Sequence, residues 1–268
     1  MKKISIFLPS IRTFYLYDFY KTIENSCQQN SFEVVIASPF DLPQELQNKD
    51  NIKLIKTYSH PTKAAHLAAL ACEGELIYHT TDDVLFLENS IDKAIDLFKS
   101  KCSAKDIVSM RYIESINHEE KTQYPDFYWT VGNSCPVQTL NKNWNINAHF
   151  LMRKDLYLEF GGFDCCFEYL TQASADLLVR LQKNGSFVFN SIDNICTADW
   201  SGGSKGEEHK PIQVAQEQLD TPLFWNIWSN NYHYRDKINI NNHLNYPEKW
   251  ERRFGKNNPK TYNEMNSK

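Results

Sequence analysis

The chain has 268 residues, of which 41% are hydrophobic and 13% aromatic, enough for one substantial core. A formal net charge of −4 excludes the basic footprint typical of nucleic-acid-binding domains. No apolar run reaches the roughly 18 residues that a membrane-spanning helix needs.

Strand and helix patterns alternate through the first part of the chain. The apolar segment Ile4–Leu8 is expected to form a strand, because it is short for a signal peptide and meets Pro9 at once. This alternation predicts a mainly parallel sheet with helices on both faces. In chain order we then expect a helix over 14–27, strands over 32–37 and 52–57, a helix over 62–72, a strand over 76–80, a helix over 88–99 and a strand over 106–113.

The second part of the chain is less regular. Residues 114–146 are polar and aromatic and are expected to form a long loop of the kind that often binds ligands. The last residues are expected to form a weakly structured tail. Between them we expect a strand over 148–152, helices over 155–160 and 174–184, strands over 187–192 and 195–200, and a helix over 211–228.

Two adjacent carboxylates, Asp82 and Asp83, follow the strand expected over 76–80. Ligands of α/β sheets bind beyond the carboxyl ends of the strands, which is where this pair would lie. Two hard oxygen ligands at such an edge suit Mg²⁺ or Mn²⁺, which would neutralise a diphosphate. The alternative is that the pair merely opens a turn or caps the next helix.

Several segments match one known family in order and spacing. Ile4–Ser10 is similar to its opening strand, which ends in Pro-Ser beside the nucleotide base, and Glu33–Ser38 to its second strand, with Ser38 in the place of an Asp. Gly74–Asp83 is similar to its metal-motif segment, and Gly161–Asp164 to its acceptor-side segment. Over roughly residues 3–200 the chain therefore resembles the family 2 glycosyltransferases, which have the GT-A fold.

The resemblance implies a fold class and a division of the chain. The fold would be α/β, a GT-A (Rossmann-like) mainly parallel sheet flanked by helices, with an irregular acceptor-side C-terminal half. Residues 1–113 would form the nucleotide-sugar-binding half of a single domain. Residues 114–230 would form the acceptor-binding and catalytic half, and residues 231–268 a C-terminal extension or tail.

On the donor side, the resemblance implies that a nucleotide-diphosphate sugar lies across the carboxyl edge of the first strands. Pro9, Ser10 and Arg12 would flank the base and ribose, with Ser38 nearby and the Arg12 guanidinium in contact with the nucleotide. Lys63 would reach a phosphate, unless it is a solvated lysine at the start of a helix.

The same resemblance implies a divalent cofactor, Mn²⁺ or Mg²⁺. Asp83 aligns with the second carboxylate of the family's Asp-x-Asp motif, whereas Thr81 replaces the first. Asp82 would contact the metal or a phosphate. His209 would complete the metal site from a closing segment, or is simply an exposed histidine. The ion would stabilise charge on the leaving diphosphate.

A carboxylate is also expected as the base that deprotonates the acceptor hydroxyl, so that a single displacement inverts the anomeric centre. The family's Glu-Asp pair is absent, and Ala173–Leu177 stands in its place. Asp176 is the first candidate for the base and Glu168 the second. Because Asp176 and Arg180 are four residues apart on the expected helix, an ion pair between them is the alternative to catalysis.

The favoured function is an inverting, metal-dependent glycosyltransferase that moves a sugar to a glycan or lipid-linked acceptor in bacterial surface polysaccharide synthesis. The alternative is a noncatalytic nucleotide-sugar-binding or scaffolding relative, motivated by Thr81, Ser38 and the missing Glu-Asp pair. A sugar-phosphate nucleotidyltransferase is less favoured, because Ser10–Phe14 contains no glycine.

Cysteine usage indicates the compartment. The seven cysteines are irregularly spaced, with no C-x-x-C pair, which favours reduced thiols in a cytoplasmic protein. The basic and aromatic segment 248–268 would either touch an anionic membrane peripherally, at its inner face, or remain solvated.

Overall fold

The computed structural model describes residues 4–116, 118, 120–121, 144–191, 193, 195–199, 209–230 and 235–266. Within these ranges the strands form a seven-stranded sheet of order β10-β6-β9-β4-β1-β2-β3 and a four-stranded sheet of order β5-β11-β7-β8. The expected α/β architecture with a mainly parallel sheet is confirmed.

The elements have the following bounds. The larger sheet contains β1 (Ile4–Pro9), β2 (Phe32–Ser38), β3 (Ile52–Lys56), β4 (Leu76–His79), β6 (Ile107–Ser109), β9 (Phe150–Arg153) and β10 (Val188–Asn190). The smaller sheet contains β5 (Val84–Phe86), β7 (Tyr112–Ile116), β8 (Glu120–Lys121) and β11 (Cys196–Asp199). The described α-helices are α1 (Leu16–Ser26), α2 (Pro61–Ala71), α3 (Ser90–Lys101), α4 (Lys154–Glu159), α5 (Leu170–Lys183), α6 (Lys210–Ala215), α7 (Thr221–Asn230), α8 (Glu251–Phe254) and α9 (Tyr262–Asn266).

The centre of the larger sheet is parallel. β1 pairs in parallel with both β2 and β4, and β2 pairs in parallel with β3. β9 is antiparallel to its two neighbours, β4 and β6. Because parallel strands end at the same edge of a sheet, the segments that follow β1, β2, β3 and β4 meet there.

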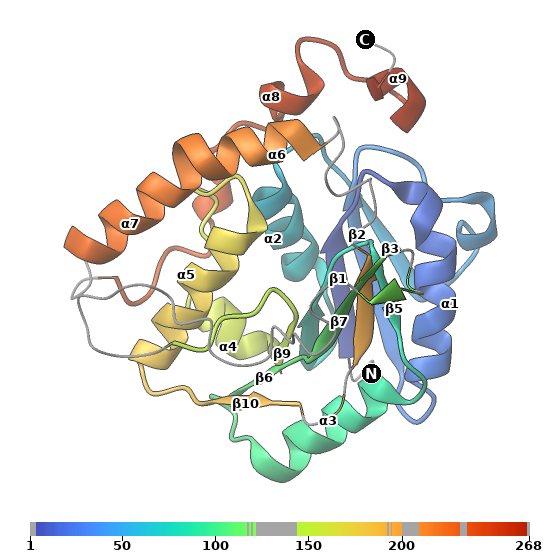
Figure 1. Cartoon of the computed structure of the whole chain (residues 1–268), viewed down its shortest axis with the longest axis vertical. Coiled ribbons are helices and arrows are strands. Elements are labelled where there is room, and N and C mark those ends of the chain that lie inside the picture. The colour runs from blue at the N-terminus through green and yellow to red at the C-terminus, as the bar shows by residue number, and fades with distance from the viewer. Residues whose placement is uncertain are drawn as a thin grey trace.

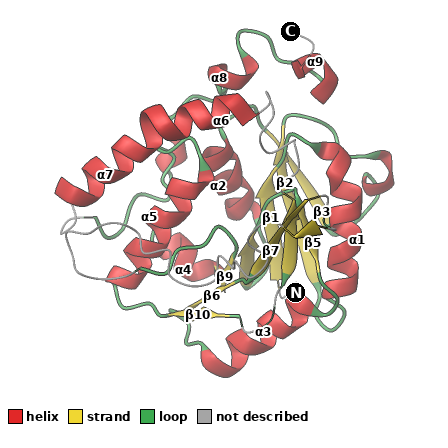
Figure 2. Ribbon diagram, in the orientation of Figure 1, coloured by secondary structure: helices red, strands yellow, loops and turns green. Residues whose placement is uncertain are grey.

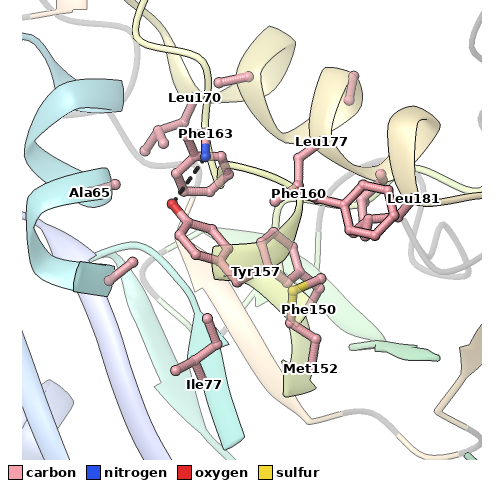
Figure 3. Packing of buried hydrophobic residues seen from close by; sticks show 14 of the residues in the cluster. Ala65, Ile77, Phe150, Met152, Tyr157, Phe160, Phe163, Leu170, Leu177 and Leu181 are labelled. Carbon is pink, nitrogen blue, oxygen red and sulfur yellow. Dashed lines mark hydrogen bonds between the residues drawn. The ribbon is translucent and has the colours of Figure 1, made fainter. Parts of the chain in front are cut away.

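Helices cover both faces of this sheet (Figures 1 and 2). Ile4, Ile6 and Leu8 of β1 pack with α1 and α3 in one core cluster, whereas Phe7 packs with α2, α4, α5 and α7 in another. This division follows from the alternation of side chains along a strand. In the second cluster the Tyr157 hydroxyl accepts a hydrogen bond from the Phe163 N–H at 3.1 Å, which fixes the turn after α4 (Figure 3).

The structure corrects two of the expected elements. The single strand expected over 106–113 is two strands, β6 and β7, which belong to different sheets. The single helix expected over 211–228 is α6 and α7 joined by a π-helical turn at Gln216–Asp220. In the expected loop over 114–146 the structure places the end of β7 and all of β8, and residues 117, 119 and 122–143 lie outside the described residues.

The expectation of a solvated tail is wrong. Residues 246–266, which we name the C-terminal clasp, fold back onto the first half of the chain, and α8 and α9 lie near α6 (Figure 1). Trp250 and Phe254 are only 5% and 1% exposed and pack with Phe40, from the segment after β2, and with Met265. Tyr58 and Lys249 form an isolated parallel β-bridge. The described helices include none with the length and apolar character needed to cross a membrane.

Candidate functional site

A cleft opens at the carboxyl edge of β1, β2, β3 and β4. The segments after these strands, the first turns of α2 and α5, and residues of α6 and α8 line it. It holds about 810 Å³ of empty space, part of which is open solvent at its mouth. The structure brings the following sequence-predicted residues together there: Pro9, Ser10, Arg12, Thr81, Asp82, Asp83 and His209.

An arginine neutralises the acidic pair inside this cleft. Asp82 accepts hydrogen bonds from the Ser10 hydroxyl at 2.7 Å and, through its other oxygen, from the Arg12 guanidinium. The same guanidinium lies 3.3 Å from Asp83, whose second oxygen accepts a bond from the Thr81 hydroxyl at 2.5 Å. Arg12 and Asp82 are 7% and 6% exposed, so water screens this pair poorly. The end of β1 is thereby tied to the end of β4.

This arrangement does not fit a bound divalent ion. Both Asp82 oxygens already accept hydrogen bonds, and the Arg12 guanidinium occupies the position between the carboxylates from which it would repel a second cation. Among the described residues, no three His, Cys, Asp or Glu side chains are grouped as possible metal ligands. His209 lines the cleft but belongs to no such group. The acidic pair is thus compensated by Arg12 and not arranged to hold Mn²⁺ or Mg²⁺.

Two residues that were expected to contact the nucleotide sugar, Ser38 and Lys63, make structural contacts instead. Ser38 is fully buried, and its hydroxyl accepts the Phe40 N–H at 3.1 Å, so it shapes the turn after β2 instead of facing a base. Lys63 is also fully buried, and its ammonium donates to the Tyr246 carbonyl and to the Glu248 carboxylate, both at 2.8 Å. Neither residue lines the cleft. Lys63 holds the C-terminal clasp and does not reach a phosphate there.

Asp176, the first candidate for the base, does not line the cleft. It is fully buried on α5, and its oxygens accept from the Arg180 Nε at 2.9 Å and from the Arg235 Nε at 2.6 Å. Arg235 also donates to Asp164 at 2.7 Å. The Asp176 carboxylate is therefore buried between two guanidiniums and lies outside the cleft lining. Its role is structural, because it links α5 to the segment that carries Arg235. The ion-pair alternative for Asp176 is the one that the structure shows.

Glu168, the second candidate, lies beside the cleft but is already engaged. One of its oxygens accepts hydrogen bonds from the Trp250 Nε1 at 2.8 Å and from the Arg252 Nε at 2.9 Å. Its neighbour Tyr169 lines the cleft, whereas Glu168 itself does not. In this arrangement Glu168 fastens the C-terminal clasp to the start of α5.

Asp220, in the π-helical turn, supports the same wall of the cleft. It is fully buried, and its oxygens accept the backbone N–H groups of Glu168 at 3.0 Å and Tyr169 at 2.6 Å. Burial raises the pKa of Asp220 to about 6, although these two hydrogen bonds oppose the shift. Nothing in the local sequence distinguishes this Asp from a solvated one, so its role could be found only in the fold.

The clasp also supplies cleft residues that the sequence reasoning missed. Trp250, Arg253 and Phe254 line the cleft beside the segment that follows β3. The only signal was the basic and aromatic composition of residues 248–268. That composition fits a membrane-facing or solvated segment equally well, so the position of the clasp is a result of the tertiary structure alone.

Comparison with known proteins relates the fold to solved structures. No protein-family model matches the sequence, and no curated protein matches it. A crystal structure of S. aureus TarS matches with a TM-score of 0.52 at 15% identity, covering 87% of this chain and 43% of that chain. TarS 1–349 in complex with UDP has a TM-score of 0.51 at 15% identity, with 86% and 71% covered.

A third structure, TarS 1–349 in complex with UDP-GlcNAc, also has a TM-score of 0.51 at 15% identity, covering 85% of this chain and 72% of that chain. The chain therefore spans less than half of the first of these TarS chains. At this identity the likeness shows the fold alone, which is the α/β GT-A architecture.

Proposed function

We propose that the chain binds a nucleotide-diphosphate sugar in the cleft at the carboxyl edge of β1–β4 and acts as a glycosyltransferase. The observation that carries the proposal is the position of this cleft, where Ser10 and Arg12 after β1 meet Asp82 and Asp83 after β4. Ligands bind at this edge in α/β sheets. The likeness in fold to TarS, which has been crystallised with UDP and with UDP-GlcNAc, supports the choice of ligand.

In the proposed reaction, an acceptor hydroxyl oxygen bonds to the anomeric carbon as the bond from that carbon to the diphosphate breaks. The acceptor hydroxyl passes its proton to bulk water, and a nucleoside diphosphate leaves with the electron pair of the broken bond. A single displacement of this kind inverts the anomeric centre. Arg12 and Arg253, which both line the cleft, would balance the charge that develops on the diphosphate. We propose a glycan or lipid-linked acceptor and a place in bacterial surface polysaccharide synthesis.

One observation favours a second function, that of a noncatalytic nucleotide-sugar-binding or scaffolding relative. Asp176 is enclosed by Arg180 and Arg235, and Glu168 is bound by the clasp, so neither candidate base faces the cleft. A protein with this site would still bind the donor. In that case neither Asp176 nor Glu168 would act as the general base.

Calorimetry with a panel of nucleoside diphosphates (UDP, ADP, GDP, CDP and dTDP) tests the shared part of both functions. We expect at least one of them to bind, and the absence of binding across the panel would refute both. Release of nucleotide from the matching nucleotide sugar, in the presence of glycan acceptors, then separates the two. Binding without release on any acceptor favours the noncatalytic relative.

A further inference from the structure

The C-terminal clasp is attached to the wall of the cleft formed by β3 and α2. The Trp250 N–H donates to the Tyr58 carbonyl at 2.8 Å, and the Tyr58 hydroxyl donates to the Pro259 carbonyl at 2.8 Å. The buried Lys63 adds its bonds to Tyr246 and Glu248. Because Lys63 is fully buried, releasing the clasp would leave an ammonium group poorly compensated. The attachment is therefore a stable part of the fold.

The clasp is also attached to the start of α5, whose Glu168 carbonyl accepts a hydrogen bond from the Thr62 N–H of α2 at 3.2 Å. Glu168, at the start of α5, accepts hydrogen bonds from the Trp250 indole and the Arg252 guanidinium. Asp220 in turn holds the backbone of Glu168. The clasp thus joins the segment after β3 to the start of α5, and Trp250 contributes to both attachments.

Between these attachments the clasp presents a cation on an aromatic surface. Trp250, Arg253 and Phe254 are spaced so that they share one face of α8, and all three line the cleft. The Arg253 guanidinium lies over the Trp250 ring at 5.5 Å from its centroid, a distance at which the ring attracts the cation. The Phe254 ring meets the Tyr58 ring edge-on at 5.3 Å.

The acidic residues that line the same cleft make such a cation favourable for binding an anionic ligand. Asp82 and Asp83 carry two negative charges there, and Arg12 compensates for one of them. A nucleoside diphosphate adds further negative charge, so a second guanidinium is favourable. The end of β2 supplies Ala37 and Pro39 to the lining, because the Ser38 hydroxyl is turned to Phe40. Polar recognition of the nucleotide therefore has to come from other elements.

We infer that the C-terminal clasp is part of the nucleotide site, with Arg253 binding the nucleotide together with Arg12. This inference rests on the proposed function and names a residue that selects the ligand of that same site. Trp250 holds the guanidinium of Arg253 in place, and Glu168 acts as a positioning residue through Trp250.

The test compares Arg253→Gln with Lys256→Gln in the full chain. Both changes remove one positive charge from the clasp, but Lys256 is exposed and does not line the cleft. For the tightest-binding nucleoside diphosphate of the panel, we expect Arg253→Gln to weaken affinity about tenfold or more, as expected for one lost charge-assisted hydrogen bond. Lys256→Gln should stay within about twofold of wild type, as expected for a surface change.

The outcomes separate the inference from the proposed function. If wild type binds none of the nucleotides, the proposed function fails. If wild type binds but the two variants have equal affinity, or Arg253→Gln binds more tightly, the inference alone is overturned. Thermal unfolding checks that the variants are folded. Should Arg253→Gln be unfolded, Arg253→Lys is measured instead, because it keeps the charge and loses the planar fork. It should bind the nucleotide more weakly than wild type, and an affinity equal to that of wild type would overturn the inference.

Discussion

Replacing Arg12 with methionine tests the charge arrangement of the cleft. The change keeps an apolar stem of similar length and removes the guanidinium that bonds Asp82 and lies 3.3 Å from Asp83. The side chains of Arg12 and Asp82 are 8% and 6% exposed, so little water can solvate the Asp82 carboxylate once the guanidinium is removed. Breaking a buried pair on one side typically costs about 3–5 kcal/mol. We expect the lower end of that range, because the Ser10 hydroxyl still donates to Asp82.

The effect on binding follows from the same geometry. Loss of a hydrogen bond to a charged group costs about 1.5–3 kcal/mol, which corresponds to roughly 10–150-fold in affinity for a nucleoside diphosphate. Urea unfolding measures the change in stability, and calorimetry measures the change in affinity. Arg12→Lys is the matched control, because it retains the positive charge without the planar fork.

A double-mutant cycle gives the decisive result. If Arg12 mainly compensates for Asp82, then Arg12→Met combined with Asp82→Asn should be more stable than the sum of the two single changes predicts, by about 1 kcal/mol or more. The reasoning is refuted if Arg12→Met leaves the free energy of unfolding unchanged, or if the two changes are strictly additive.

Three further predictions concern other parts of the molecule. Asp176→Asn should destabilise the fold by about 3–5 kcal/mol in urea unfolding, because Arg180 and Arg235 lose the charge that compensates for them; an unchanged stability would contradict a structural role. Asp220 has a pKa raised from 3.8 to about 6 by burial, so its protonated form stabilises the fold below about pH 4, and this contribution is lost as the pH rises through about 6. Stability should therefore fall by up to about 3 kcal/mol over that window relative to Asp220→Asn, and parallel pH profiles for the two proteins would show that the shift is absent. Chelation of divalent ions should change nucleotide affinity by less than about twofold, because Arg12 already compensates for the acidic pair; a loss of tenfold or more in calorimetry would mean that Arg12 gives up its place to a metal ion.

The placement of the cleft could be predicted from local patterns. Ile4–Leu8 and Leu76–Thr80 read as buried strands, and a parallel sheet necessarily brings the residues after them to one edge. The strand pattern placed Asp82 and Asp83 at this edge, and the resemblance to the family 2 glycosyltransferases implied that Ser10 and Arg12 lie there too. The structure places the four side chains together.

The partners of these side chains could not be predicted in the same way. Asp176 was expected to act as a base, but its second arginine, Arg235, comes 59 residues later. Lys63 was expected at a phosphate, but its partners lie more than 180 residues away, in the clasp. Contacts at such separations leave no trace in hydrophobic periodicity, because they depend on which surfaces meet after the elements have packed.

The sequence by itself determined the α/β architecture and the edge of the sheet at which a ligand would bind, because strand and helix periods are encoded residue by residue. Only the tertiary structure decided that Arg12 compensates for the acidic pair, that Asp176 is buried, and that the C-terminal clasp forms a wall of the cleft. The physical reason is that a buried charge must find its partner wherever the packed chain provides one, whatever the distance along the sequence.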